Sequence, residues 1–190
     1  MKIVTAMLVC VLMACAAGGA RAQDNKFPDV RDSSFVAANG ERTMRQAIVV
    51  PADAHAVWLA LSTADGWKGW AVATAYVDFR EGGQIETNYQ PERPQGDRDN
   101  IRNQIIAFVP DRMLVFRNVQ APTSFKNPEM FSQIVTTIRL EAIDATHTEV
   151  TISGAGYRAE PAFDDLYARF QWGNAYSLVE LRKHFTASSQ

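Results

Sequence analysis

The spacing of apolar residues changes several times along this chain, and each change marks a predicted element. An apolar run over residues 48–50 ends at Pro51, which is typical of the end of a strand. Asp53 then stands where the N-cap of a helix is expected. The apolar residues after it recur at the spacing of one helical face: Ala54, Val57, Trp58 and Leu61. A second, tryptophan-rich helix is predicted over residues 64–70.

Glycines mark two of the turns between predicted strands. A strand over residues 75–79 runs into residues 80–83, where two glycines allow positive φ without steric cost. Asn39-Gly40 is a strong hairpin signal between residues 34–37 and 42–50. We therefore expect a small extra strand paired with the first long strand.

Alternation with period two predicts the remaining strands. The next strand carries Ile85, Thr87 and Tyr89 on a face predicted to be buried, whereas Glu86 and Asn88 are predicted to face solvent. Four further strands, and a long loop over residues 119–128, are expected: 100–109, 112–119, 131–143 and 148–157. The short connections are typical of an antiparallel sheet.

A long C-terminal helix is predicted to begin at Pro161. Acidic Asp164 and Asp165 in its first turn and basic residues 182–184 in its last turn complement the helix dipole. Steps of three and four define a stripe with one polar member: Phe163, Tyr167, Phe170, Asn174, Leu178, Leu181 and Phe185.

The order of these motifs resembles a known superfamily. Val50-Pro51-Ala52, Val57-Trp58, a tryptophan-rich second helix and Phe79-Arg80-Glu81-Gly82-Gly83 are similar to the SRPBCC (START-like, helix-grip) superfamily, and within it to the Hsp90-ATPase-activator-homologue-like branch. The resemblance implies an α+β fold: a curved antiparallel sheet of about six or seven strands wraps around a long C-terminal helix, with two short helices after the first long strand. It also implies a ligand cavity between sheet and helix. The superfamily includes lipid carriers, hormone receptors and polyketide cyclases, so the resemblance specifies fold more closely than function.

The N-terminus has the pattern of an export signal. Lys2 precedes an apolar run over residues 3–17, and Ala20-Arg21-Ala22 has the small-x-small form that signal peptidase cuts. We expect cleavage after Ala22 and a periplasmic or secreted protein, with a polar tether over 23–32 and a single domain over 33–190. An alternative is a lipobox at Leu12-Met13-Ala14-Cys15, which would leave a lipid anchor on Cys15.

Composition excludes several kinds of function. Both cysteines, Cys10 and Cys15, lie in the leader, so cleavage leaves no thiol for disulfides, nucleophilic catalysis or metal binding. Loss of Lys2 and Arg21 lowers the 19 basic residues to 17 against 21 acidic ones, which makes the net charge −4. Nucleic acid is therefore not an expected partner, and no membrane span is expected in the mature chain.

Asn174 is the most informative site candidate because it interrupts the helical stripe where the cavity is expected. Its amide would either orient a polar group of a ligand or bond to nearby backbone or a buried water. Aromatic residues are candidates for lining the cavity, although core packing explains each of them equally: Trp70, Phe79, Tyr89, Phe108, Phe116, Phe131 and Phe170. Strand parity leaves the directions of Phe108 and Phe116 open.

Motifs of common catalytic and metal sites are missing from the sequence. The three histidines are widely separated, and there is no nucleophile elbow, phosphate-binding glycine loop or dinucleotide fingerprint. Asp97 and Asp99 flank Arg98, which favours a solvated loop over a calcium site. Glu86 and Glu141 would become plausible general bases only if they faced the cavity. No catalytic residue, cofactor or metal is assigned.

Three hypotheses remain open. The first is an exported domain that binds a small hydrophobic or amphipathic ligand between the sheet and the C-terminal helix. The second is a cavity enzyme of the polyketide cyclase or dehydratase type that works by proton transfer. The third is a protein-interaction module, in which residues 121–128 would be the first surface to test. The ligand and the oligomeric state are not specified by the sequence.

Overall fold

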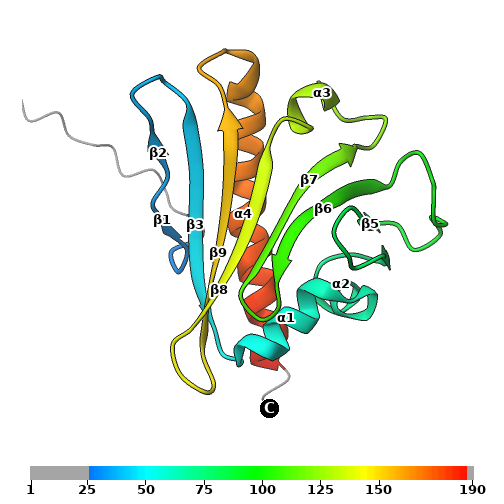
Figure 1. The fold of residues 1–190 in the computed structure, drawn as a ribbon, viewed down its shortest axis with the longest axis vertical. Coiled ribbons are helices and arrows are strands. Elements are labelled where there is room, and N and C mark those ends of the chain that lie inside the picture. The colour runs from blue at the N-terminus through cyan, green and yellow to red at the C-terminus, as the bar shows by residue number, and fades with distance from the viewer. Residues whose placement is uncertain (1–25, 188–190) are drawn as a thin grey trace, which may run out of the picture.

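A single antiparallel sheet dominates the computed structural model, which describes residues 26–187 (Figure 1). Its strands are β1 Arg31–Asp32, β2 Phe35–Val36, β3 Arg42–Val50, β4 Thr74–Val77, β5 Gln84–Asn88, β6 Ile101–Val109, β7 Met113–Gln120, β8 Val135–Ala142 and β9 Thr148–Tyr157. The helices are α1 Ala54–Ser62, α2 Ala64–Trp70, α3 Pro128–Phe131 and α4 Ala162–Ala187. The sheet order is β1-β3-β9-β8-β7-β6-β5-β4, and β2 also pairs with β3.

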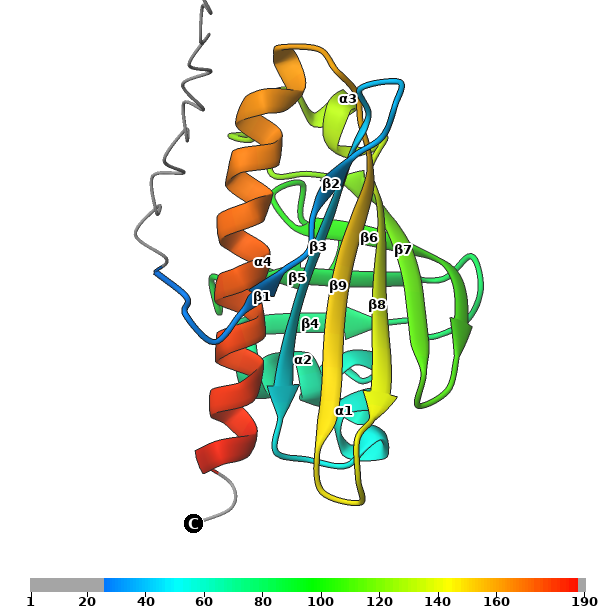
Figure 2. The ribbon, with the colours of Figure 1, turned by 90° about the vertical axis from the view of Figure 1, so that its left-hand side faces the viewer.

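The predicted helix-grip fold is confirmed. Helix α4 lies along one face of the sheet, and β4 to β6 run across the direction of β3, β9 and β8 (Figure 2). This strong twist lets one sheet curve around a single helix. Among residues 26–187, seven strands have four residues or more, and β1 and β2 add two short ones.

Two caps confirm the predicted start of the short helices. The Asp53 side chain accepts a hydrogen bond from Ala56 N at 2.9 Å, and the Thr63 hydroxyl accepts one from Gly66 N at 2.9 Å. Gly66 lets α2 approach α1 closely, because a Cβ at this position would lie 2.3 Å from the carbonyl oxygen of Leu59. The close approach of these two helices therefore depends on Gly66.

The predicted hairpin between β2 and β3 is also confirmed. Phe35 pairs with Thr43, and Gly40 takes a φ of +82° in the turn. This φ lies in the left-handed region that glycine adopts without strain.

The segment assigned to a tether lies against the domain in its described part, residues 26–32. Val30 is buried, and β1 pairs with β3. Asp29 forms an ion pair with Arg182 of α4 at 2.6 Å, and the Phe27 ring packs edge-on against Trp172 with centroids 5.9 Å apart. The isolated Phe27 gave no sign of this packing in the sequence, because its ring partner Trp172 lies near the other end of the chain.

Strand β5 corrects the prediction that one of its faces is exposed to solvent. Glu86 and Asn88 are both buried, as are Ile85 and Thr87 on the opposite face. The loop over residues 89–100 folds back over Glu86 and Asn88 and supplies their hydrogen-bond partners. Tyr89, which was predicted to be buried, is instead 71% exposed because it lies just past the end of the strand.

A second correction concerns the strand predicted over residues 131–143. Phe131 lies in the short helix α3, and the strand begins only at Val135. Asn127 has a φ of +56° and Pro128 starts the helical turn, so the local chain chemistry favours a turn here.

The core consists of two clusters. The larger one packs α1 and the C-terminal half of α4 against the sheet, with Val57, Leu114 and Leu178 completely buried. The smaller one surrounds Tyr157 and Phe163 near the start of α4. Burial raises the pKa of the Tyr157 hydroxyl well above its ordinary value.

The predicted signal peptide, residues 1–22, and the alternative anchor at Cys15 lie outside the described residues. Within residues 26–187, none of the helices has the length and hydropathy needed to cross a membrane.

Candidate functional site

A cleft of about 230 Å³ lies between the sheet and α4. Helix α2 contributes one end of its wall, α3 contributes Phe131, and β5 to β8 contribute the sheet side. The lining residues are Trp67, Trp70, Ala71, Val72, Thr87, Tyr89, Ile101, Asn103, Phe116, Phe131, Thr136, Phe170, Asn174, Tyr176, Ser177 and Glu180. The cleft separates the two core clusters, since Trp67, Trp70 and Phe116 pack on the larger one and Phe131 and Phe170 on the smaller one.

Aromatic rings are held in place on both sides of the cleft. Trp67 and Trp70 stack with centroids 5.3 Å apart, and their indole nitrogens donate to carbonyl oxygens of α1 at 2.7 and 3.0 Å. On the opposite side, Phe131 packs against Phe170 at 4.7 Å. The hydrogen bonds explain why two tryptophans face a cleft with fixed orientations.

Asn174 lies in the cleft wall at the middle of α4. Its amide nitrogen donates to Met44 Sδ on β3 at 3.3 Å, so part of its hydrogen-bonding capacity is satisfied by the core. Its Oδ1 accepts no hydrogen bond from residues 26–187. The nitrogen of this amide is therefore bonded to a core side chain, and the contact with a ligand stays a prediction.

Six of the eight candidate residues line this cleft: Trp70, Tyr89, Phe116, Phe131, Phe170 and Asn174. Phe79 and Phe108 do not. Their rings pack against each other at 4.9 Å and against Trp58 at 5.4 and 6.2 Å, in the larger core cluster. The sequence left core packing open as the alternative for each aromatic residue. The structure shows core packing for Phe79 and Phe108.

Sequence reasoning missed several lining residues. Trp67 lies three residues before Trp70 on α2, so both rings lie on the same side of the helix. This spacing could have indicated that Trp67 also lines the cleft. Tyr176 lies off the apolar stripe of α4 and stacks on Trp172 with centroids 5.2 Å apart. Thr136 and Ser177 are small polar residues at positions that look solvated in the sequence, so only the tertiary fold places them here.

Ionisable groups are sparse in this cleft. Within the described part of the chain, Glu180 is the one carboxylate among the lining residues, and its Oε1 accepts a hydrogen bond from Lys183 Nζ at 2.8 Å. Glu86 faces the other side of the sheet, where its Oε1 accepts hydrogen bonds from Gly96 N and Asn100 Nδ2, each at 2.5 Å. Glu141 is exposed and pairs with Arg139. The two strand carboxylates considered as general bases therefore lie outside the cleft.

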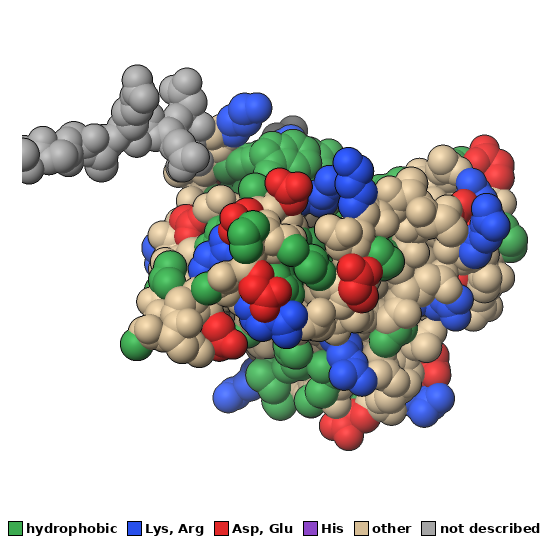
Figure 3. Space-filling model, turned by 90° about the horizontal axis from the view of Figure 1, so that it is seen from above, with side chains coloured by type: hydrophobic (Ala, Val, Ile, Leu, Met, Phe, Trp, Pro, Cys, Tyr) green, Lys and Arg blue, Asp and Glu red, His purple; other side chains and the backbone are tan. Residues whose placement is uncertain are grey.

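Among residues 26–187, no three His, Cys, Asp or Glu side chains are grouped so that they could hold a metal ion. Acidic and basic side chains are interspersed over the end of the molecule seen from above (Figure 3). A nucleic-acid interface requires a continuous basic surface, and this face does not offer one.

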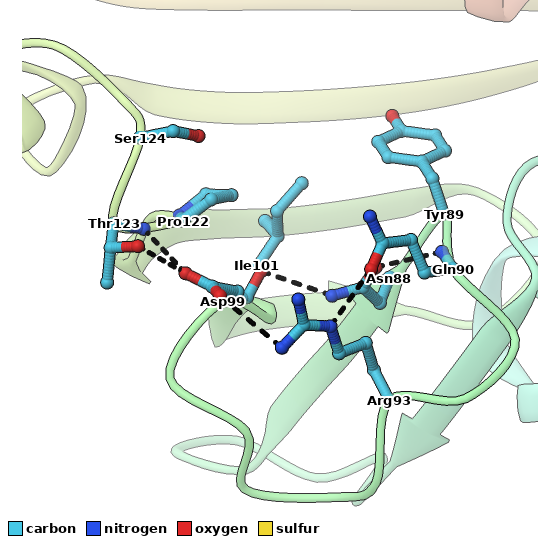
Figure 4. A pocket seen from close by; sticks show the side chains of 9 residues that line it. All are labelled: Asn88, Tyr89, Gln90, Arg93, Asp99, Ile101, Pro122, Thr123 and Ser124. Atoms are coloured by element: carbon cyan, nitrogen blue, oxygen red, sulfur yellow. Dashed lines mark hydrogen bonds and ion pairs between the residues drawn. The ribbon is translucent and has the colours of Figure 1, made fainter.

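A second pocket, of about 300 Å³, adjoins the cleft, and six of its nine lining residues carry amide, aliphatic hydroxyl or charged side chains (Figure 4). It is lined by Asn88, Tyr89, Gln90, Arg93, Asp99, Ile101, Pro122, Thr123 and Ser124. Tyr89 and Ile101 line both spaces, and in Figure 4 their side chains point away from Arg93. Asp99 accepts hydrogen bonds from the Thr123 hydroxyl and backbone N–H, which hold the pKa of the Asp99 carboxyl below its ordinary value.

A curved antiparallel sheet that grips one long helix, with a cleft between them, defines a helix-grip domain. Residues 51–185 match the family of Activator of Hsp90 ATPase homolog 1-like proteins, and the chain belongs to this family. A comparison of the sequence with curated proteins gives no match.

Solved structures share the fold at low sequence identity. The Aha1 dimer of Colwellia psychrerythraea is 18% identical, with a TM-score of 0.58 over 75% of this chain and 95% of that one. Protein MLL2253 of Mesorhizobium loti is 16% identical, with a TM-score of 0.59 over 77% of this chain and 98% of that one. CalU16 of Micromonospora echinospora is 16% identical, with a TM-score of 0.57 over 84% and 88% of the two chains. At these identities the comparison establishes a shared fold and nothing further.

Proposed function

We propose that this protein is exported and binds a small apolar or amphipathic molecule in the cleft between the sheet and α4. The observation that carries the proposal is the lining of the cleft: seven aromatic side chains surround a space of about 230 Å³. Removing an apolar ligand and these rings from water together is favourable. Export rests on the leader pattern of residues 1–22.

The polar atoms of the cleft support an oriented ligand. Asn174 Oδ1 and the hydroxyl groups of Thr136 and Ser177 make no hydrogen bonds with the described residues, and all three residues line the same space. A few such groups in an apolar pocket select the orientation of a ligand and contribute little to nonspecific binding.

The enzyme hypothesis has less support. Proton transfer needs an ionisable group positioned beside the substrate. Glu180 is engaged by Lys183, and its side chain is 27% exposed, so the environment of this carboxylate is that of a surface ion pair. We propose a carrier or receptor role and assign no catalytic residue.

The activator function in the family name is not carried over to this chain. Hsp90-type chaperones are cytosolic partners, and the leader pattern favours a protein outside the cytosol. Two residues of the 121–128 segment are also engaged internally, since Thr123 binds Asp99 and Phe125 packs on Phe131.

Fluorescence of Trp67 and Trp70 provides the test of ligand binding. Titration of the purified protein with octanol should change the tryptophan emission and saturate. Thr136→Phe, which fills the cleft, should weaken binding by about tenfold or more, because the ring occupies the ligand's volume. Thr137→Phe, on the next residue of β8 and outside the cleft lining, should bind as the wild type does. Absence of saturable binding to the wild type, or equal loss in both variants, would overturn the proposal.

Native mass spectrometry of protein isolated separately from the periplasmic, membrane and cytosolic fractions of its own cells tests export and the ligand together. A chain that begins at Gln23 and carries a stoichiometric adduct is the expected result. A chain lipidated at Cys15 would replace cleavage after Ala22 with anchoring, and a full-length cytosolic chain would contradict export.

A further inference from the structure

The aromatic cleft and the polar pocket are neighbouring spaces with a shared wall. Tyr89 and Ile101 line both, and both are positioned at the ends of β5 and β6. A molecule lying across this wall would have an apolar part among the rings beside α4 and a polar part among the side chains of the 89–100 loop. The two spaces have comparable volumes, about 230 and 300 Å³.

Charges around the polar pocket are already compensated. The Arg93 guanidinium lies 3.2 Å from Asp97 and 3.4 Å from Asp99, and its Nε donates to Gln90 Oε1 at 3.0 Å. Arg98 adds a weaker favourable electrostatic contribution at Asp99. An anionic group in this pocket would meet the Asp99 carboxylate, and a cationic group would meet a guanidinium, so neither charge finds an unpaired partner.

Hydrogen-bonding groups remain available in the same pocket. Gln90 Nε2 and the Ser124 hydroxyl have no hydrogen-bond partner among residues 26–187. The amide can donate, and the hydroxyl can donate and accept, so together they match a group that carries several hydroxyls.

Hydrogen bonds connect the segments that form this pocket. Asp99 fastens the 89–100 loop to the 121–127 segment through Thr123, and Asn88 Nδ2 donates to Asp99 O at 3.2 Å and to Asn100 Oδ1 at 2.8 Å. A prearranged pocket of this kind loses little conformational entropy when a ligand binds.

We infer that the two spaces form one bipartite site for an amphiphile with an uncharged, hydroxyl-rich head group: the head lies between Gln90, Asp99 and Ser124, and the apolar part lies in the aromatic cleft. This inference rests on the proposed function and extends it, because it names the chemical class of the ligand and assigns a second subsite. Residues of the head-group subsite make no contribution to binding of a purely apolar molecule.

The experiment compares four probes with the same eight-carbon chain: octyl glucoside, octanol, octanoate and octylammonium. Octanol is kept below its solubility limit and the other three below their micelle concentrations. Binding to the purified protein is followed by tryptophan fluorescence and calorimetry. Octyl glucoside should bind about tenfold more tightly than octanol, the size expected for one or two additional hydrogen bonds. Octanoate and octylammonium should both bind more weakly than octyl glucoside.

A double variant separates the subsites. Gln90→Leu with Ser124→Ala should bring the affinity for octyl glucoside down to that for octanol and leave the affinity for octanol unchanged. Thr136→Phe should weaken binding of both probes. Circular dichroism verifies that the variants fold. Ser124→Ala alone removes a single unpartnered hydroxyl and should lower the affinity for octyl glucoside to a smaller extent.

The outcomes distinguish this inference from the proposed function. If octanol binds and octyl glucoside binds no better, the head-group subsite is refuted while the apolar cleft stands. If octanoate or octylammonium binds as tightly as octyl glucoside, the uncharged head is refuted. If none of the probes binds, the proposed function itself fails.

Discussion

Asn174 on α4 donates a hydrogen bond to the sulfur of Met44 on β3, with a distance of 3.3 Å between nitrogen and sulfur. Met44 is completely buried, and Asn174 lines the cleft. The pair therefore joins α4 to the sheet beside the proposed ligand site.

Substitutions at Asn174 should distinguish a lost hydrogen bond from a buried charge. Asn174→Leu should change the free energy of unfolding by less than about 1 kcal/mol, because hydrogen bonds to sulfur are weak and the new side chain is apolar. Asn174→Asp should cost about 2 kcal/mol more at pH 7, because a carboxylate enters an aromatic cleft without a cation. Urea denaturation measures both. An Asp variant as stable as the wild type would indicate that water fills this part of the cleft.

Two glycines in helices should respond to alanine with opposite signs. At Gly66 a Cβ would lie 2.3 Å from Leu59 O and 2.6 Å from Ala60 Cα, whereas at Gly173 it would meet no atom within 4 Å. Gly66→Ala should therefore destabilise the protein by about 2 kcal/mol or more, since backbone must move. Gly173→Ala should stabilise it by about 0.5–1 kcal/mol through helix propensity. Thermal unfolding of the two variants provides the comparison, and a neutral Gly66→Ala would contradict the close packing of α1 and α2.

Buried Glu86 and exposed Glu141 offer a matched pair of strand carboxylates. Glu86→Ala leaves the Gly96 N–H and the Asn100 amide without their acceptor, and we expect a loss of about 2–3 kcal/mol in unfolding free energy. Glu141→Ala removes a surface pair with Arg139 and should change stability by less than about 0.5 kcal/mol. Equal effects in chemical denaturation would mean that the 89–100 loop does not cover Glu86 in solution.

The turn between β8 and β9 predicts a pH dependence. The Thr146 backbone N–H, with His147 and the Thr146 hydroxyl, lowers the pKa of Asp144 to about 2. Because the folded-state pKa lies below the ordinary value of 3.8, the ionised carboxylate stabilises the folded turn above that value. The contribution should disappear as the pH falls from about 4 to 2.

Asp144→Asn should accordingly be less stable than the wild type at pH 7, and the difference should vanish at the acidic end of this range. Carboxyl titration by NMR measures the pKa directly. A titration of Asp144 at its ordinary value would show that the turn does not hold its hydrogen bonds in solution.

Local chain chemistry was enough to predict most of the fold. Asp53 as an N-cap, the turn at Asn39-Gly40 and the three- and four-residue steps of α4 depend on hydrogen bonds and spacings within a few residues of one another. The helix-grip fold and the space beside α4 were predicted from the resemblance of the motif order around Trp58 and Gly82 to a known superfamily.

Only the tertiary structure decided which side chains share that space. Phe108 and Phe116 lie on neighbouring strands with similar apolar patterns, yet Phe108 packs on Trp58 and Phe116 lines the cleft. Which space each ring enters depends on strand curvature and on the register shifts between β6 and β7. Neither can be predicted from the local sequence pattern.

The same reason explains the error on β5 and the packing of residues 26–32, which the sequence did not indicate. Glu86 is buried by a loop that follows it, and Phe27 is held by Trp172 at the other end of the chain. Burial depends on which segments cover a residue, and the fold sets those neighbours, whether they follow closely, as for Glu86, or lie at the other end of the chain, as for Phe27. The sequence by itself therefore determined the elements and their order, and long-range packing decided the composition of the site.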